Sequence, residues 1–265
     1  MIMQKTGLVP ERRRNEIVRL AKEKGIISTA DLVKKFKVSK STLSRDLKIL
    51  EENKEIIKTF GGVKFNDAEA YSFDSSTGEQ INEKRAIAKL AFSLITEGSS
   101  ILLMPGVTTF ELAKLIVTSG LNIWVITNSL KAISHFVEHG FYNVTALGGE
   151  FFPRGRSFKG KLAIESMKLL DAKEAFIGVH GIDPEIGITL PFFEETELVG
   201  VAMERCKRKI ILADSSKFGR VSLYRVNKRI EEIDVVVTDG GTPRHYVEAL
   251  KSKGVEVLIA EVGEF

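Results

Sequence analysis

At residues 28–63 the chain reads STADLVKKFKVSKSTLSRDLKILEENKEIIKTFGGV. Ser28, with Asp31 three residues later, predicts the capped start of a short helix, because both side chains can bond backbone N–H groups that lack a partner within the helix. Residues 37–38 then turn the chain, and Ser39 can cap a second helix. The stretch therefore predicts two short helices joined by a tight turn.

The second of these helices has two different faces. An apolar stripe repeats with the 3.6-residue period of a helix and comprises Leu43, Leu47 and Leu50. The opposite face carries polar side chains at the same spacing, namely Ser41, Arg45 and Lys48. By itself this pattern fits either an amphipathic hairpin with a solvated charged face or a helix that enters a DNA groove.

The flanking residues favour the DNA-binding interpretation. Upstream, a first helix has an inner face of Ile17, Leu20 and Ala21 and ends at Gly25. Downstream, residues 56–60, the pair Gly61-Gly62 and residues 63–65 predict a strand, a turn and a strand. Three helices followed by a hairpin form a winged helix-turn-helix.

Several polar residues of this unit have a predicted role at DNA. Arg45 would read a base edge, where Arg on guanine is the commonest pairing, or else contact a phosphate. Ser41 and Thr42 could serve either, and Lys40 and Lys48 would neutralise phosphates. The run of residues 12–14, Arg-Arg-Arg, is either a phosphate clamp or a solvated helix end. The predicted DNA-contacting set is Lys40, Ser41, Thr42, Arg45, Lys48, Arg13 and Lys58.

The charge distribution separates a basic head from an acidic body. Residues 1–65 carry 16 basic and 8 acidic side chains, a net charge of +8, whereas the whole chain of 265 residues is +4. The other 200 residues are therefore at −4. This asymmetry predicts a polyanionic partner for the head alone.

Composition points to a globular protein in a reducing compartment. Apolar residues make up 43% of the chain, and no apolar run approaches the roughly 20 residues that a membrane helix needs. The one cysteine, Cys206, excludes an internal disulfide framework and is expected to be a packed thiol in a helix. We expect a cytoplasmic protein with no membrane partner.

A polar segment, residues 66–82, predicts a linker between the head and a second domain, and Asn82 could cap the helix that follows. Beyond it, short apolar runs alternate with helical patterns, which predicts a largely parallel sheet with crossover helices. The predicted strands are residues 101–103, 123–126, 144–147, 175–177, 210–212, 235–237 and 255–259. The predicted domains are thus 1–65, a winged helix-turn-helix, and 83–265, an α/β domain.

Small and polar residues follow these strands, where parallel sheets bind ligands. Gly106 with Thr108 and Thr109 opens a helix and predicts a phosphate cradle, because N–H groups and the helix dipole favour an anion there. Lys217 could add a positive charge at the shared mouth. The predicted effector-binding set is Gly106, Val107, Thr108, Thr109, Asn128, Ser129, Gly149, Gly181 and Lys217.

These motifs resemble the DeoR family of bacterial transcription regulators over nearly the full length of the chain. VSKSTLSRDLKILEENKEI with TFGGV resembles the N-terminal signature, and TNSL, LGGE, AFIGVHGI and DSSKFG resemble the sensor domain. The resemblance implies a sensor fold similar to ribose-5-phosphate isomerases and CoA transferases, without catalysis. It also implies repression of a carbohydrate operon, control by a phosphorylated sugar, and assembly as a homodimer or homotetramer.

Two positions depart from the family pattern. Met104-Pro105 stand where Asp-Ser or Asp-Ala is usual, so a carboxylate that could bind sugar hydroxyls is missing and Pro105 has no backbone donor. Ser44 stands where a second Arg is common beside Arg45, which suggests a shifted operator preference.

Other constellations carry less weight. His135 and His139 have the spacing of a helical zinc pair, but Phe136 replaces the Glu of a zincin and no third ligand suggests itself, so a surface helix and no metal are expected. The carboxylates of Asp183, Glu185, Glu194 and Glu195 are either remnants of an acid/base site or solvated loop groups. No cofactor and no catalytic residue is predicted.

Two functions from different classes follow from the sequence. The first is a regulator that binds a double-stranded DNA operator and responds to a phosphorylated effector. The alternative is a sugar-phosphate isomerase or transferase with an appended DNA-binding head.

Overall fold

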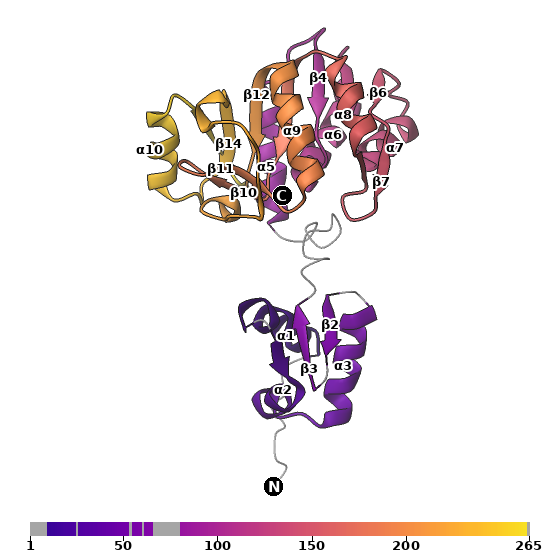
Figure 1. Ribbon diagram of the computed structural model, residues 1–265, viewed down its shortest axis with the longest axis vertical. Coiled ribbons are helices and arrows are strands. Elements are labelled where there is room, and N and C mark those ends of the chain that lie inside the picture. The colour runs from indigo at the N-terminus through magenta and orange to yellow at the C-terminus, as the bar shows by residue number, and fades with distance from the viewer. Residues whose placement is uncertain (1–9, 25, 53–54, 60, 66–79, 264–265) are drawn as a thin grey trace. The chain divides into compact units, whose positions relative to one another are not determined.

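The computed structural model describes residues 10–24, 26–52, 55–59, 61–65 and 80–263. The chain divides into two compact units, residues 1–75 and 76–265 (Figure 1). Most of the predicted linker, residues 66–82, lies outside the described residues.

The N-terminal unit contains the predicted elements of a winged helix-turn-helix. Its helices are α1 (Pro10–Lys24), α2 (Thr29–Phe36) and α3 (Lys40–Glu52), and its strands are β1 (Ile26–Ser28), β2 (Ile56–Thr59) and β3 (Gly62–Phe65). The strands form an antiparallel sheet in the order β1-β3-β2. The short strand β1, whose last residue Ser28 is the N-cap of α2, is an addition to the predicted hairpin.

Side-chain caps and an apolar core explain why these helices form where they do. The Ser28 hydroxyl accepts a hydrogen bond from the Asp31 N–H at 3.0 Å, and Ser39 does the same for Thr42 at 3.1 Å. Leu43, Leu47 and Leu50 are at most 3% exposed, and they share a core with the predicted inner face of α1. The caps and the apolar stripe predicted from the sequence are therefore confirmed.

The second unit is built on a seven-stranded sheet in which every neighbouring pair is parallel. Its order is β15-β14-β12-β9-β4-β5-β6. All seven strands correspond to predicted ones: β4 (Ser100–Leu103), β5 (Trp124–Thr127), β6 (Val144–Ala146), β9 (Ala172–Gly178), β12 (Cys206–Leu212), β14 (Val235–Asp239) and β15 (Glu256–Ala260).

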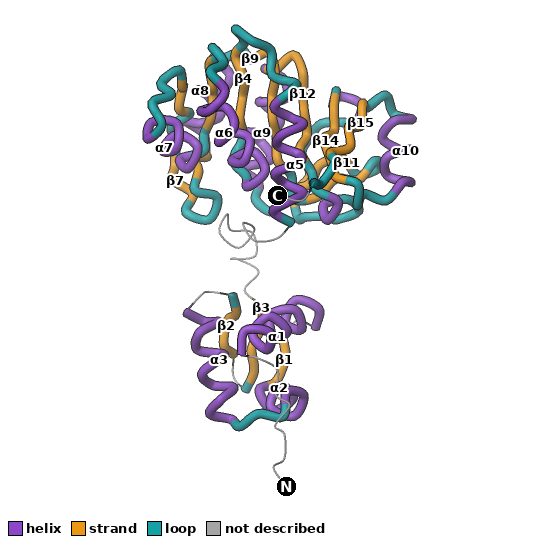
Figure 2. The backbone as a smooth tube through the Cα atoms, turned by 180° about the vertical axis from the view of Figure 1, so that it is seen from behind, coloured by secondary structure: helices purple, strands orange, loops and turns teal. Residues whose placement is uncertain are grey.

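Helices cover both faces of this sheet (Figure 2). Alternate residues of a strand point to opposite faces, so Leu102 belongs to one apolar core whereas Ile101 and Leu103 belong to the other. The helices on the Leu102 face are α8 (Lys161–Lys168), α9 (Phe193–Arg205) and α10 (Arg244–Ser252). Those on the other face are α5 (Ile81–Phe92), α6 (Val107–Ser119) and α7 (Leu130–Glu138).

Two small antiparallel sheets accompany the large one, and the sequence patterns did not predict either. One is a hairpin of β7 (Glu150–Phe152) and β8 (Ser157–Lys159). The other combines β10 (Gly181–Asp183), β11 (Gly187–Leu190) and β13 (Tyr224–Arg225). Single 3-10 turns occupy residues 215–217 and 230–232.

Two local predictions in this unit were wrong. Asn82 does not cap α5, because the helix already includes Ile81 and its N-cap is Gln80. Cys206 does not lie in a helix but begins β12 directly after α9. Its thiol is buried, as expected, and burial raises the pKa of Cys206 to about 12.

Candidate DNA-binding surface and effector site

The polar face of α3 is exposed along its length. Lys40, Ser41, Arg45 and Lys48 are exposed, and Thr42 is half-buried. Within the described residues Arg45 has no ion pair, so its guanidinium is available to an external acceptor. An N-terminal half that carries hydroxyls and cations, with leucines behind it, has the arrangement of a recognition helix.

Two lysines of the predicted DNA-contacting set already have acidic partners. Lys48 and Lys58 make exposed ion pairs with Glu52 and Glu51. Such pairs contribute little to stability and can exchange for phosphate.

Arg13 does not have the exposure that a phosphate clamp requires. Its side chain is 7% exposed, and its Nε lies 2.7 Å from Oδ2 of Asp46, which is 5% exposed. Arg14 reaches the other oxygen of the same carboxylate at 3.6 Å. This buried pair joins α1 to the residue that follows Arg45, so Arg13 supports the recognition helix from behind.

In the second unit, four predicted loops meet at one edge of the sheet. Strands β12, β9, β4 and β5 are neighbours and parallel, so the loops after their carboxyl ends lie together. Gly106 follows β4 and occupies the N-cap of α6, where no side chain caps the helix. The N–H groups of the first turn of α6 therefore suit an anion.

The two threonines of this turn face inward. Thr109 is 1% exposed, and its hydroxyl donates to the Gly106 carbonyl oxygen at 3.0 Å. Thr108 is 7% exposed. An anion bound at this loop would consequently contact backbone N–H groups more than hydroxyls.

Met104, which stands where the family pattern has an Asp, is an apolar core residue. It is 4% exposed and belongs to the apolar core on the Leu102 face of the sheet. The position therefore adds packing where a carboxylate would add a polar group.

Asn128 and Ser129 are held by the β7–β8 hairpin. The Asn128 amide donates to the Phe158 carbonyl oxygen at 2.7 Å, whereas its Oδ1 is buried and has no hydrogen-bond partner among the described residues. Ser129 caps α7 through the Ala132 N–H. Asn128 is thus a positioned side chain with one unused acceptor, while Ser129 is engaged in the fold.

Two predicted glycines have structural explanations. A Cβ on Gly181 would lie 2.0 Å from the Arg220 carbonyl oxygen. On Gly149, which has φ +140°, it would lie 2.4 Å from the Lys159 carbonyl oxygen. Close backbone contacts require glycine at both positions, so neither supplies a reason to expect a ligand there.

Lys217 lies beside His180 at the ends of β12 and β9. Its side chain is 15% exposed, and its Nζ is 3.8 Å from Oδ2 of the buried Asp214. Burial, with the charges of Lys217 and Arg220, lowers the pKa of His180 to about 3. The loops after these strands therefore bring the cations of Lys217 and Arg220 near a neutral imidazole.

Sequence reasoning missed Lys159, which lies next to Phe158 on the hairpin that holds Asn128. Its Nζ is 3.3 Å from Oε2 of Glu194 and 4.4 Å from the centroid of the Phe152 ring. Paired aromatics around a Pro-Arg-Gly-Arg turn could have predicted this hairpin. In the chain, Lys159 directly follows the residue whose carbonyl oxygen holds Asn128.

The four carboxylates that the sequence offered as an acid/base site, Asp183, Glu185, Glu194 and Glu195, lie in two different environments. Asp183 accepts from the Glu185 and Ile186 N–H groups in a turn, and Glu185 pairs with Lys253. Glu194 and Glu195 lie in the first turn of α9, where burial raises the pKa of Glu195 to about 7.

A polar pocket of about 440 Å³ lies apart from the predicted loops, between β11 and the 3-10 turn at 230–232. Its two lysines are already paired: Lys253 with Glu185 and Glu231, and Lys228 with Glu204 and Glu232. It contains none of the predicted effector-binding residues. In the described part of the chain, no helix is long and apolar enough to span a membrane.

The N-terminal unit is a winged helix-turn-helix. The second unit is a parallel sheet with helices on both faces, and the loops at the carboxyl ends of its strands suit an anion. These features together define a transcription regulator with a small-molecule sensor. The chain belongs to the DeoR family: the DeoR C terminal sensor domain matches residues 79–240, and the DeoR-like helix-turn-helix domain matches residues 13–69.

Individual relatives agree with this assignment. The HTH-type transcriptional repressor GlcR of Bacillus subtilis (strain 168) is 31% identical over 96% of this chain and 98% of its own length. The lactose phosphotransferase system repressor of Staphylococcus epidermidis is 31% identical over 86% of this chain and 91% of its own. Relatives with these names support the regulator over the alternative enzyme.

A solved enzyme structure aligns with part of the chain. Ribose 5 phosphate isomerase A from Neisseria gonorrhoeae aligns with 52% of this chain and 53% of its own, with a TM-score of 0.39 and 16% identity.

Proposed function

We propose that this DeoR-family regulator acts in the cytoplasm and represses an operon of carbohydrate metabolism. It would bind a double-stranded operator through α3 and change its DNA affinity when a phosphorylated sugar or related metabolite enters the edge of the sheet. The relatives named as repressors, one of them of the lactose phosphotransferase system, support the repressor role. The observation that carries the DNA-binding mode is the exposed Arg45 on a helix whose other face is buried.

The Arg45 assignment is tested by Arg45→Ala in the full chain. The DNA is a promoter fragment to which the parent protein binds. At the same salt concentration we expect the variant to bind this fragment about 10- to 100-fold more weakly than the parent, the loss typical of a base-reading Arg. Lys89→Ala, an exposed lysine of α5, is the control and should leave the affinity unchanged. Equal affinity of Arg45→Ala and parent would remove Arg45 from the interface.

The effector site is supported by convergence at one edge of the sheet. Three of four neighbouring strands are each followed by a group that suits a ligand. These groups are the uncapped N-terminus of α6 after β4, the unused Oδ1 of Asn128 after β5 and the cation of Lys217 after β12. A phosphate would suit the α6 N–H groups and Lys217, and a sugar hydroxyl would donate to Asn128.

A thermal-shift screen with pentose and hexose phosphates tests this site. We expect stabilisation by a phosphorylated sugar and none by its unphosphorylated form, because the anion supplies the binding contacts. The shift should vanish in Lys217→Ala and persist in Lys173→Ala, an exposed control on β9. A shift retained in Lys217→Ala would exclude that residue, and turnover that Lys217→Ala abolishes would support the enzyme instead.

The proposed assembly is a homodimer or homotetramer. Leu169 and Leu223 are 83% and 79% exposed, and Phe193 packs edge to face on Tyr224 while remaining 53% exposed. Apolar surface of this kind is typical of protein interfaces. Sedimentation equilibrium should give the mass of two or four chains of 29.4 kDa, and a monomer at micromolar concentration would contradict the assembly.

A further inference from the structure

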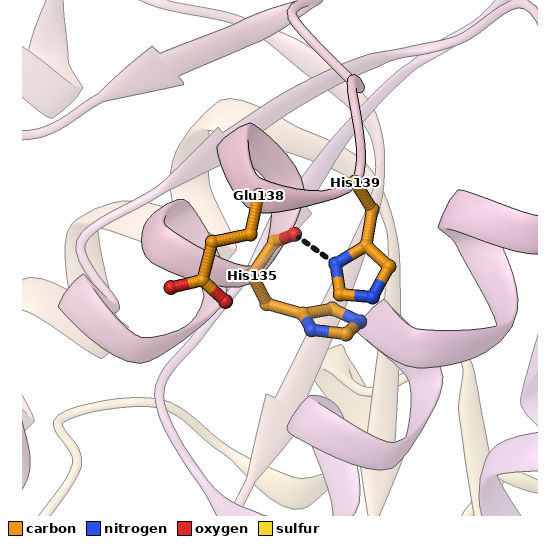
Figure 3. Close-up of side chains that lie close together, drawn as sticks. All are labelled: His135, Glu138 and His139. Carbon is orange, nitrogen blue, oxygen red and sulfur yellow. Dashed lines mark hydrogen bonds between the residues drawn. The ribbon is translucent and has the colours of Figure 1, made fainter.

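The last turn of α7 brings two histidines and a carboxylate together. His135, Glu138 and His139 are spaced i, i+3 and i+4, so they share one side of the helix. One ligand atom from each residue lies within 4.8 Å of the other two. Figure 3 shows the His135 ring between the Glu138 carboxylate and the His139 ring. The third ligand that the sequence did not suggest is therefore Glu138.

The second histidine is oriented by the helix itself. His139 Nδ1 lies 2.8 Å from the His135 carbonyl oxygen (Figure 3). A carbonyl oxygen can only accept, so Nδ1 carries the proton and Nε2 keeps its lone pair. A backbone carbonyl that fixes the ring in this way is a common partner of metal-binding histidines.

The first histidine has an unused nitrogen. His135 Nε2 is buried and lacks a hydrogen-bond partner among the described residues. The edge-to-face contact with Phe110 at 5.4 Å and the 4.1 Å approach of the His139 ring hold the imidazole in place. A buried polar atom without a partner calls for an explanation, and a bound cation supplies one.

We propose that His135, Glu138 and His139 bind a divalent transition-metal cation of the zinc, nickel or copper class. Imidazole nitrogens with one carboxylate oxygen are the ligands these ions accept, whereas calcium and magnesium prefer oxygen alone. This inference does not depend on the proposed function.

The geometry permits the site to close. Metal–ligand bonds of about 2.0–2.2 Å require ligand atoms nearer to one another than 4.8 Å. Glu138 is exposed, so its side chain can rotate inward, while half-buried His135 and the carbonyl-bound ring of His139 provide the fixed ligands. Three ligands from one helix leave positions for water, so the site would be open to solvent.

Zinc titration of the untagged, EDTA-treated full chain tests the proposal, with a chromophoric chelator as competitor. We expect one Zn²⁺ per chain at micromolar concentration. The affinity should fall at least tenfold in His139→Ala and also fall in Glu138→Gln, the variant that least disturbs the helix. His245→Ala, an exposed histidine of α10, should bind as the parent does.

Two results would overturn the site. One is no zinc binding below millimolar concentration by the folded parent, which would show a solvated helix end only. The other is binding that is the same in His139→Ala, Glu138→Gln and the parent, which would locate the metal elsewhere. Far-UV circular dichroism of each variant verifies that its total helical content equals that of the parent.

Discussion

The two units of this protein present their polar residues in opposite ways. In the N-terminal unit, the side chains suited to DNA point to solvent from one regular helix, with Arg45 exposed and Leu47 buried behind it. In the sensor unit, the side chains suited to a ligand follow separate strands and turn inward, as Thr109 and Asn128 do. The first surface exists as soon as the helix forms, whereas the second depends on the whole sheet.

This difference shows where the sequence alone indicates that a polar side chain is free to bind a partner. On a helix of known period, a polar residue opposite a leucine stripe is necessarily exposed and available. At a strand end, a hydroxyl or amide can satisfy the backbone of its own loop, as the Thr109 hydroxyl does. Three experiments test this difference.

The largest effect is expected from the one buried charge pair behind the recognition helix. Asp46→Ala removes the carboxylate that compensates Arg13, and loss of one partner of a buried pair costs about 3–5 kcal/mol of unfolding free energy. Urea denaturation followed by circular dichroism measures this cost. Glu52→Ala, which removes the exposed partner of Lys48, should cost less than about 1 kcal/mol. Similar costs for the two variants would contradict the interior role of Asp46.

An intermediate effect is expected in the sensor unit from Glu195. Burial raises the pKa of this carboxyl from 4.5 in the unfolded chain to about 7. Because the folded-state pKa is the higher one, the stability contribution is complete below pH 4.5 and is lost as pH rises through 7.

The measurement compares unfolding free energies at pH 4.5 and pH 7.5. The parent should lose about 2 kcal/mol more than Glu195→Gln over this range, a magnitude reduced for partial exposure. Glu197→Gln, an exposed residue of the same helix, should follow the parent. Parallel pH profiles for Glu195→Gln and parent would show that this acid is solvated.

The smallest effect is expected from Thr109→Val. The variant loses the hydroxyl bond to Gly106, which should cost about 1 kcal/mol and lower the Tm of the sensor unit by about 2–4 °C. The shift induced by a sugar phosphate should remain, because the backbone of α6 makes the cradle. An unchanged Tm with a lost ligand shift would mean that the hydroxyl faces the effector.

Regular elements were predictable from the sequence, whereas long-range contacts were not. The apolar runs located all seven parallel strands, and the serine caps located α2 and α3, because both signals are local. Arg13 could not be placed, since its partner Asp46 is 33 residues away. The close backbone contacts of Gly149 and Gly181 likewise join segments that no periodicity relates.

The positions of the candidate site residues were predictable in outline and only partly in detail. Strand ends indicated the correct edge of the sheet for Gly106, Asn128 and Lys217, because parallel strands end together. Lys159 was missed because the β7–β8 hairpin that carries it was missed. The exposed face of α3 required no such knowledge.

The sheet order has a consequence for how the protein is made. The N-terminal sheet pairs residues 26–28 with 62–64, so its last partner leaves the ribosome early. In the large sheet, β4 pairs with β9, and residue 101 meets residue 174. The nascent chain can therefore complete the head while the middle strand of the sensor is still untranslated. During synthesis, a DNA-binding surface precedes the domain that would regulate it.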